Sequence, residues 1–272
     1  MKLIILWSGW AIPTPRIGCL CENCKEARLN PMLKRNHSSL FIEDAKILVD
    51  CPEDIGDSLY RSGVKEVEHL FITHWHPDHT FWLRILLEST FDFYKRETVG
   101  SLIIHLPKSV HEDLKKHYPT ISYLIDTKKM ATIEYIEHGE SVNIQNITIT
   151  AVWFNWPKSH TYGYLFASNE KKCMYAPCET IEFTPEILKD YFINLDVLIH
   201  ECWILSEELK SEISFDTLMN RIRLYGPWRT VLTHIEEVEV KRWGGMKYYW
   251  ELKKKNNDIS FEYAYDGLSI SI

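Results

Sequence analysis

Residues 73–79 read Thr73-His74-Trp75-His76-Pro77-Asp78-His79, and they form the most informative stretch of this chain. Three imidazoles and one carboxylate fall within six positions, directly after an apolar run at residues 70–72. His74 and His76 alternate, so an extended segment would point both side chains the same way. Neutral imidazole and carboxylate are the usual ligands of zinc and similar divalent metals. The stretch therefore predicts a metal site on a loop between a strand and a helix.

This H-x-H-x-D-H pattern resembles the metal signature of the metallo-β-lactamase-fold hydrolases. In that family the two alternating histidines bind one metal, and the Asp and the last His bind a second. The resemblance therefore implies that His74 and His76 bind one ion and that Asp78 and His79 bind another. It also implies an α/β (α+β) fold of the αββα type, a sandwich of two mixed sheets flanked by helices.

The composition is that of an ordinary soluble globular protein. The chain has 272 residues, of which 45 % are hydrophobic and 25 % charged, so we expect one domain over residues 1–272. A net charge of −7 argues against a dedicated nucleic-acid binder. Residues 1–7 are apolar but too short for a signal peptide, and no apolar run approaches the roughly 20 residues of a membrane span. We expect a cytoplasmic protein with a small-molecule substrate, no nucleic-acid or membrane partner, and homodimer formation left open.

Hydrophobic periodicity predicts strands first, and then helices interleaved with strands. Strands are predicted at residues 1–7, 39–43, 46–50, 101–106, 146–154, 162–167, 172–175, 196–199, 230–232 and 261–272. Helices are predicted at residues 80–87, 108–117 and 214–224, and a solvated loop at residues 253–258. The order of these elements, repeated in two halves, fits two sheets between layers of helices.

Two further histidines stand where the resemblance implies metal ligands. His160 lies between two predicted strands, ahead of a Gly-Tyr pair, and His234 directly follows a buried strand late in the chain. The resemblance implies that His160 joins His74 and His76, and that His234 joins Asp78 and His79. The alternative for His160 is an ordinary solvated loop histidine. We expect all six ligands to converge at distances normal for zinc.

The bridging Asp of the family is replaced in this chain. Where relatives have a Tyr-x-x-Asp pattern, counting from Tyr175 places the Asp position on Cys178. A thiolate binds zinc and biases a site toward soft or borderline metals over Mg²⁺ or Mn²⁺. Cys178 is therefore a candidate ligand. The alternative is a buried, inert thiol beside a weak or absent second metal, and Glu179 is a less favoured substitute.

A second group of metal-ligating residues stands near the N-terminus. Cys19, Cys21 and Cys24 form a C-x-C-x-x-C pattern within residues 18–24, and an odd total of seven cysteines favours metal binding over disulfides. The pattern resembles a narrower group that holds the phosphonate-pathway cyclic phosphodiesterase and PQQ biosynthesis protein B. The resemblance implies a structural zinc knuckle whose fourth ligand, a His in the phosphodiesterase, is Glu237 here. The alternative is three free thiols.

These residues define a hydrolytic chemistry. Two divalent metals roughly 3.5–4 Å apart can hold a hydroxide nucleophile and polarise a phosphoryl or carbonyl oxygen. Asp78 is able to orient or deprotonate the attacking water as well as bind metal. The phosphodiesterase relatives supply a proton-donating His before a Ser-Phe-x-x-Leu helix, and Glu212 occupies that position here. His200, at the end of a predicted strand, is a further catalytic candidate, with a buried, hydrogen-bonded histidine as the alternative.

The favoured function is a metal-dependent hydrolase of a small phosphodiester or cyclic phosphate. The implied cofactor is zinc, with one or two ions in the active site and one structural ion, and Mn²⁺ or iron as other occupants. The alternatives are an ester or lactone hydrolase, a cofactor-biosynthesis enzyme resembling PQQ biosynthesis protein B, and a non-catalytic metal- or small-molecule-binding protein. A tRNA-processing nuclease would need an RNA-gripping arm and a basic surface, which the sequence does not indicate.

Overall fold

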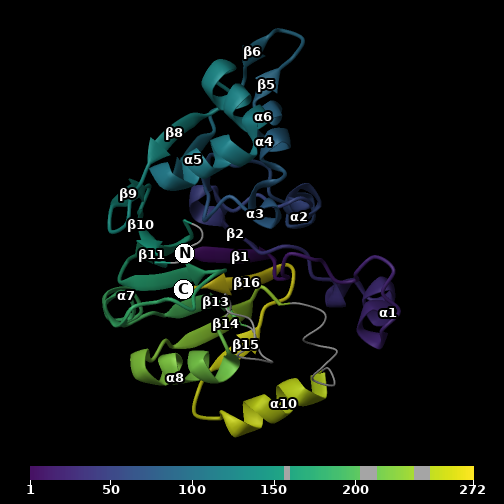
Figure 1. The fold of residues 1–272 in the computed structure, drawn as a ribbon, viewed down its shortest axis with the longest axis vertical. Coiled ribbons are helices and arrows are strands. Elements are labelled where there is room, and N and C mark those ends of the chain that lie inside the picture. Colours follow the sequence, from purple (N-terminus) through teal and green to yellow (C-terminus); the bar gives the residue numbers. More distant parts are fainter. Residues whose placement is uncertain (156–159, 203–212, 236–245) are drawn as a thin grey trace.

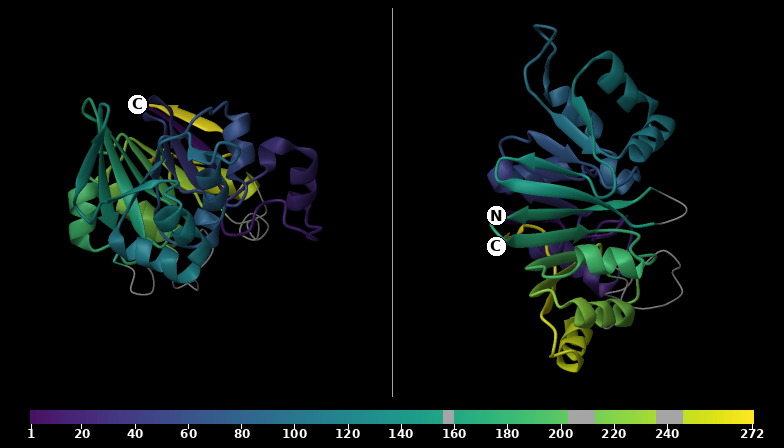
Figure 2. Two further views of the ribbon diagram at one scale, coloured as in Figure 1. Left: turned by 90° about the horizontal axis from the view of Figure 1, so that it is seen from above. Right: turned by 90° about the vertical axis from the view of Figure 1, so that its left-hand side faces the viewer.

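Two mixed β-sheets pack face to face in this protein, and helices cover their outer faces (Figures 1 and 2). The computed structural model describes residues 1–155, 160–202, 213–235 and 246–272. This αββα arrangement confirms the fold class expected from the sequence.

The first sheet has the strand order β16-β1-β2-β3-β4-β7-β8. Its strands are β1 (Lys2–Trp7), β2 (Ser39–Ile42), β3 (Ile47–Val49), β4 (His69–Phe71), β7 (Ile103–Leu106), β8 (Thr132–Tyr135) and β16 (Leu268–Ser271). Pairing is antiparallel from β16 to β3 and parallel from β3 to β8. The change to parallel pairing brings the carboxyl ends of β3 and β4 to the same edge of the sheet.

The second sheet repeats this plan, with the order β15-β14-β13-β12-β11-β10-β9. Its strands are β9 (Ser141–Ile144), β10 (Ile147–Trp153), β11 (Tyr162–Ser168), β12 (Lys171–Ala176), β13 (Val197–Glu201), β14 (Arg229–Thr233) and β15 (Phe261–Tyr263). Pairing is antiparallel from β9 to β12 and parallel from β12 to β15. The carboxyl ends of β12, β13 and β14 therefore also share one edge, where ligands gather in sheets of this kind.

The helices were only partly predictable. They are α1 (Glu22–Leu29), α2 (Ile55–Arg61), α3 (Pro77–Thr80), α4 (Leu83–Ser89), α5 (Lys108–His117), α6 (Pro119–Ser122), α7 (Pro185–Tyr191), α8 (Phe215–Tyr225) and α10 (Met246–Lys255). The helix expected at 80–87 is divided between α3 and α4. The solvated loop expected at 253–258 was wrong in its first part, because residues 253–255 are the last turn of α10, where the helix dipole favours lysines.

The core joins the two sheets and fixes the start of the metal loop. Phe71 of β4 packs edge-on against Tyr164 of β11, with the ring centroids 5.0 Å apart. The buried Tyr164 hydroxyl donates a hydrogen bond of 2.7 Å to the carbonyl oxygen of Ile72. A second apolar cluster fills the space between the other face of the second sheet and helices α7 and α8. The residue before the His motif is thus tied to the opposite sheet.

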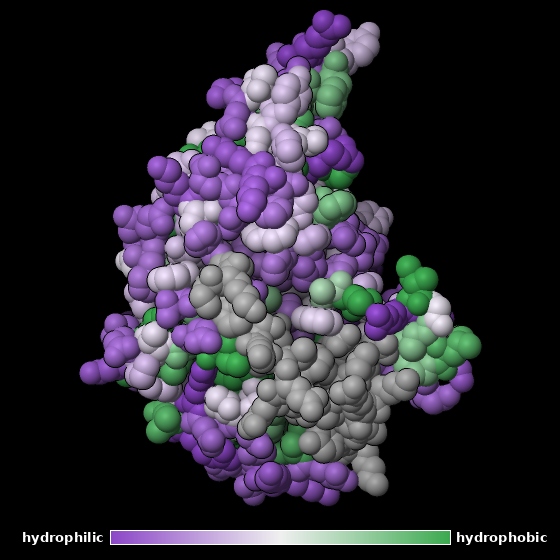
Figure 3. Space-filling view, in the orientation of Figure 1, coloured by the Kyte–Doolittle hydropathy of each residue, from purple (hydrophilic) through white to green (hydrophobic). Residues whose placement is uncertain are grey.

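Two segments project from the sandwich (Figure 1). One is the hairpin of β5 (Phe91–Asp92) and β6 (Glu97–Thr98), which the sequence did not predict. The other carries α1, and apolar atoms gather on it (Figure 3), where Ile17, Leu20 and Leu29 are exposed. Within the described ranges, none of the helices combines the length and apolarity that crossing a membrane requires.

Candidate active site and second metal centre

The H-x-H-x-D-H motif connects β4 to α3, as the sequence predicted. Proline begins α3, and His76 is the residue that precedes it. His74 Nε2 and His76 Nδ1 lie 3.0 Å apart. Two zinc–nitrogen bonds of about 2.0–2.1 Å can span such a separation. The two side chains are therefore placed as a chelating pair.

Asp50, at the carboxyl end of β3, supports two of the candidate ligands. Its buried carboxylate accepts hydrogen bonds from the Thr73 backbone and hydroxyl, each at 2.9 Å, and from His79 Nδ1 at 2.7 Å. The Thr73 oxygen lies 3.0 Å from His74 Nδ1 and accepts its proton. Because Nδ1 is the donor in both rings, Nε2 of His74 and of His79 keeps a lone pair for a metal.

Asp50 was not identified as a functional residue from the sequence. The available signal was an Asp that ends a predicted strand near a ligand motif. The residue has a φ of 62°, a left-handed conformation that Asp tolerates better than most residues. Its role became visible only when the fold placed β3 beside β4.

Asp78, His79 and His234 form one group of potential metal ligands, with donor atoms within 4.8 Å of one another. Asp78 Oδ2 is 3.5 Å from His79 Nε2 and 4.0 Å from His234 Nε2. Both of these nitrogens are buried and have no hydrogen-bond partner among the described residues. Leaving buried acceptors unpaired costs free energy. A divalent cation would satisfy them, so the donor set fits a metal.

Cys178 forms a second group with His74 and His79, again with donor atoms within 4.8 Å. These two histidines come from the two different metal pairs that the motif predicts. The thiol is buried, and burial, together with the carboxylates of Glu201 and Glu179, raises its pKa well above the usual value. The sulfur thus lies where a ligand shared between two ions would lie. A bound cation would be needed to stabilise it as a thiolate.

His160 is not part of either group of convergent donor atoms, and its convergence with the other ligands stays a prediction. Its side chain is 51 % exposed, and Nδ1 lies 2.8 Å from Asp113 Oδ2 on α5. A carboxylate on a neighbouring helix is a strong hydrogen-bond acceptor for imidazole. As with Asp50 and His79, a proton on Nδ1 would leave the Nε2 lone pair of His160 for a metal.

The remaining candidates lie apart from the ligand groups or outside the described residues. His200 is buried between the rings of Phe183 and Phe192, and its Nδ1 donates to the Glu201 carbonyl oxygen at 2.6 Å. Burial lowers its pKa to about 3. These contacts agree with the buried, hydrogen-bonded alternative. Glu212 and Glu237 both fall outside the described residues.

Glu201 is a buried carboxylate at the carboxyl end of β13. It accepts a hydrogen bond of 2.5 Å from the Thr180 backbone, and burial raises its pKa to about 7. The neighbouring Glu179 accepts a hydrogen bond from the Thr161 hydroxyl. The segment that carries Cys178 is thus tied to β13 through Glu201 and to Thr161 through Glu179.

The electrostatics favour the protonation states that metal binding needs at three of the candidate ligands. Burial lowers the pKa of His234 to about 3, and burial with the nearby imidazoles lowers the pKa of His74 well below its usual value. Burial by itself would raise the pKa of Asp78, but His79 and His234 outweigh it and the pKa falls. His74 and His234 are therefore neutral and Asp78 is ionised near pH 7, as ligands must be. Burial would lower the pKa of His79, but Asp50 and Asp78 outweigh it and the pKa rises, so a cation has to displace a proton from this ring.

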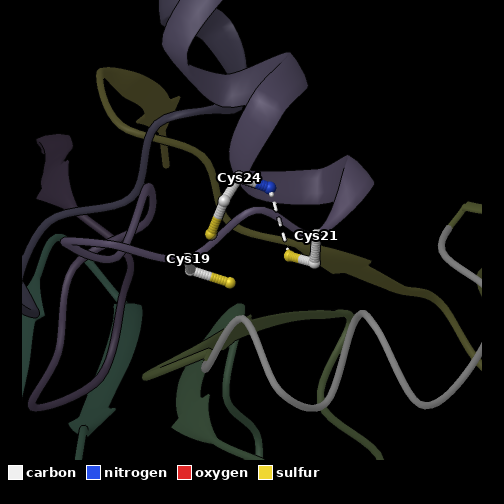
Figure 4. A group of neighbouring side chains, drawn as sticks. All are labelled: Cys19, Cys21 and Cys24. Atoms are coloured by element: carbon white, nitrogen blue, oxygen red, sulfur yellow. Dashed lines mark hydrogen bonds between the residues drawn. The ribbon is translucent and has the colours of Figure 1, made fainter.

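The Cys cluster is a separate centre. The sulfurs of Cys19, Cys21 and Cys24 lie within 4.8 Å of one another and point toward a common space beside α1 (Figure 4). Cys21 caps α1 by accepting a 3.4 Å hydrogen bond from the Cys24 backbone, and Cys24 accepts one of 3.3 Å from the Arg16 backbone. Within the described ranges no fourth His, Cys, Asp or Glu joins this group. Three convergent thiols fit three of the four positions of a structural zinc.

Comparison with known proteins agrees with the fold and the motif. Residues 45–235 match the family described as the beta-lactamase superfamily domain, so the chain belongs to this superfamily. Its class is therefore that of the metal-dependent hydrolases with an αββα sandwich.

Three known proteins are examples of what the chain is similar to. A ribonuclease Z from Picrophilus torridus is 33 % identical over 175 residues, which is 62 % of this chain and 48 % of that protein. The chain thus spans about half the length of that curated relative. A diphosphatase from the PhnP family has a TM-score of 0.75 at 20 % identity, with 100 % of this chain and 97 % of the other covered. Zinc-bound PqqB from Methylobacterium extorquens has a TM-score of 0.79 at 14 % identity, with both chains fully covered.

Proposed function

We propose that this protein is a zinc-dependent hydrolase of small phosphodiesters. The observation that carries the proposal is the convergence of buried donor atoms at the carboxyl ends of β4, β12 and β14. Two of these atoms, Nε2 of His79 and Nε2 of His234, have no partner among the described residues. Such a donor set has little structural value without a cation, because each unpaired buried nitrogen is destabilising.

A phosphodiester is favoured over a carboxylic ester by the relatives. Two of them are a diphosphatase and a ribonuclease, which are enzymes that break bonds to phosphorus. Bound divalent cations would polarise the phosphoryl oxygens and lower the pKa of water.

The candidate residues of the chain would then have separate roles. His74, His76, His79 and His234 hold the cations, Asp50 orients His79, and Asp78 stays ionised to bind or to accept a proton.

Nitrogen and sulfur donors make zinc the favoured ion. Imidazole suits zinc, iron and copper, and a thiolate such as Cys178 selects against Mg²⁺ and Mn²⁺. The three thiols of Cys19, Cys21 and Cys24 are proposed to hold a further, structural zinc, with Glu237 as the fourth ligand. We thus expect up to three zinc ions for each chain, two of them in the active site.

Metal analysis combined with a substrate screen tests the proposal. The purified protein would be analysed for bound metal and then assayed with cyclic phosphates, linear phosphodiesters, carboxylic esters and lactones. We expect zinc in the active site and turnover of at least one phosphodiester, which His79→Ala abolishes. Turnover of esters or lactones alone would refute the substrate class. Full turnover by the metal-stripped protein would refute the metal dependence.

A non-catalytic, metal-binding function is the second candidate. The specific observation in its favour is that, among the described residues, neither His76 nor His160 belongs to a group of convergent donor atoms, whereas Asp78, His79 and His234 form one. On this account the site holds a single cation on Asp78, His79 and His234. One active-site metal with no turnover of any substrate class would favour this function.

A further inference from the structure

Four aromatic side chains form a continuous surface beside the metal motif. Trp75 stacks on His117, at the end of α5, with ring centroids 3.7 Å apart and an angle of 10° between the planes. Tyr118 lies 6.4 Å from Trp75, and Phe81 meets Tyr118 edge-on at 6.1 Å. We call these four residues the aromatic surface. The aromatic surface extends from the end of α5 to residues on both sides of α3.

The aromatic surface begins next to a predicted metal ligand. The Trp75 ring lies 4.8 Å from the His76 ring, at an angle of 74°. The Thr80 hydroxyl lies within hydrogen-bond distance of the carbonyl oxygens of Trp75 and His76, at 3.0 and 2.9 Å. The backbone that places Trp75 is therefore the same backbone that places His76. A group bound to the aromatic surface would be held close to the metal-binding nitrogens.

Packing alone does not account for this surface. Phe81 is 58 % exposed, and His117 is exposed although Trp75 covers one face of its ring. Trp75 and Tyr118 are half-buried. A surface used only to pack α5 on α3 would bury its aromatic rings more completely. Exposed aromatic rings beside a reactive centre are a common feature of binding sites.

Basic and acidic groups both lie near the aromatic surface. The last turn of α5 contains Lys115, Lys116 and His117. One turn earlier, Asp113 on the same helix holds His160 through Nδ1 at 2.8 Å. Helix α5 thus contacts two segments in which the sequence predicts ligands. Lys115 is paired with Glu112 at 3.6 Å, and the carboxylates of Asp78 and Glu53 act on Tyr118, so the cations held by the motif would attract the phosphate.

We propose that the aromatic surface binds a planar ring in the group that the phosphate keeps after cleavage, either a nucleobase or an aryl group. This proposal rests on the proposed function. The ring stacks on His117 and Tyr118 while the phosphate reaches the cations held by the motif. Stacking on aromatic side chains tolerates many ring types, because every base has a π-face. His117 is therefore a specificity residue that selects ring-bearing phosphodiesters.

A pair of substrates with one leaving group tests the selection. Bis(p-nitrophenyl) phosphate and methyl p-nitrophenyl phosphate differ in whether the retained group is an aryl ring. We expect His117→Ala to raise KM about tenfold for the aryl substrate, which corresponds to about 1.4 kcal/mol, and to leave kcat and the methyl substrate unchanged. His117→Phe should restore KM, because it keeps the ring without the nitrogens. Tyr123→Ala removes another exposed aromatic ring outside the surface and should change neither constant.

Two results would overturn the proposal. The first is an equal change of KM for both substrates, because a general defect is not ring selection. The second is a His117→Phe variant as poor as His117→Ala, because the nitrogens rather than the ring would then matter.

Binding measurements separate this proposal from the proposed function. Adenosine monophosphate, phenyl phosphate and ribose 5-phosphate would be titrated by calorimetry into the metal-loaded protein and into His117→Ala. We expect the two ring-bearing ligands to bind more tightly than ribose 5-phosphate, and the advantage to disappear in the variant; their ranking distinguishes a nucleobase from an aryl group. Ring selectivity without cleavage of any phosphodiester would refute the proposed function but not ring binding at the aromatic surface. Cleavage of phosphodiesters without ring selectivity would refute ring binding at the aromatic surface but not the proposed function.

Discussion

The His-rich site and the Cys cluster are both candidate metal centres, but the chain builds them in opposite ways. The donors of the His-rich site come from residues 74–79, 178 and 234, on segments that follow strands of both sheets. The donors of the Cys cluster lie within residues 19–24, on a segment that projects from the sandwich (Figure 1). One centre is assembled by the whole fold, and the other is local.

The two centres also differ in what supports their ligands. Asp50 fixes His79 directly and His74 through Thr73, so their orientation is set by buried hydrogen bonds. In the Cys cluster, Cys24 accepts a hydrogen bond from the Arg16 backbone and Cys21 accepts one from the Cys24 backbone. Buried side chains therefore orient the ligands of the His-rich site before metal arrives, and we expect an ion bound at the Cys cluster to contribute to the folding free energy.

The largest effect is expected from Asp50→Asn, which tests this preparation. An amide can still accept the hydrogen bond of Thr73, but its NH₂ group would face His79 Nδ1. His79 would then have to carry its proton on Nε2, and the lone pair for the metal would be lost. We expect metal affinity at the active site to fall 10- to 100-fold, in line with other outer-sphere mutations, and hydrolysis to fall with it.

Titration with a chelator, followed by metal analysis, measures this change. Asp54→Ala is a matched control, since Asp54 is exposed and makes no side-chain cap to α2. Zinc at the Cys cluster should be retained in both variants. Unaltered active-site affinity in Asp50→Asn would show that Asp50 does not organise the ligands.

Removing a thiol tests the opposite claim for the Cys cluster. Cys21→Ala should release about one zinc per chain and lower the melting temperature, because the binding free energy of a structural zinc contributes to folding. The active-site metal should stay in the protein that remains folded. Cys51→Ala removes a buried thiol that belongs to neither donor group and should lower stability without loss of zinc. Equal zinc content in wild type and Cys21→Ala would contradict the structural role.

Cys178→Asp asks whether the two halves of the His-rich site share a ligand. If the sulfur bridges, a carboxylate should raise occupancy of the weaker metal and alter the rate, because its two oxygens bridge more readily. If the thiol is only packed, the variant buries a charge and melts at a lower temperature with unchanged metal content. Cys173→Asp is the matched control, since Cys173 on β12 is buried outside the donor groups. Unchanged metals, stability and rate in Cys178→Asp would contradict both accounts.

The parts that could be predicted from sequence depend on local pattern. The motif at 73–79, the strand before His234 and the position of Cys178 relative to Tyr175 follow from spacing along the chain, and the structure brings these residues together. The parts that could not be predicted concern partners from distant elements. The bond between His160 and Asp113 joins residues 47 positions apart, and Asp50 meets Thr73 and His79 only through parallel pairing of β3 and β4. No periodicity encodes such contacts.

A third group of histidines contrasts with the His-rich site, because three of its ring nitrogens have partners in the protein. His69 Nδ1 lies 3.0 Å from His105 Nε2, and His105 Nδ1 lies 3.5 Å from Glu134, across β4, β7 and β8. A proton on each Nδ1 satisfies both contacts, so His105 needs no cation. Burial, together with His69, lowers the pKa of His105 to about 3. This group should affect stability and leave metal content unchanged.

The lowered pKa of His105 decides whether the stability of the protein rises or falls with pH. Between the unfolded value of about 6.5 and the folded value of about 3, the unfolded chain binds more protons at this site. Stability is therefore lost as pH falls through this window, with a slope approaching 1.4 kcal/mol per pH unit. His105→Gln keeps an acceptor for His69 and a donor for Glu134 but does not titrate. We expect it to unfold within about 1 kcal/mol of wild type at pH 7, and to lose less stability than wild type between pH 6.5 and pH 4.

Urea unfolding at several pH values measures the difference. Other acidic and basic groups contribute equally to both proteins, so the gap between the two curves isolates His105. A gap that stays constant with pH would show that His105 does not carry this dependence. A loss of active-site metal in His105→Gln would show instead that the third histidine group supports the His-rich site through β4, and the division between partnered and metal-binding histidines would have to be redrawn.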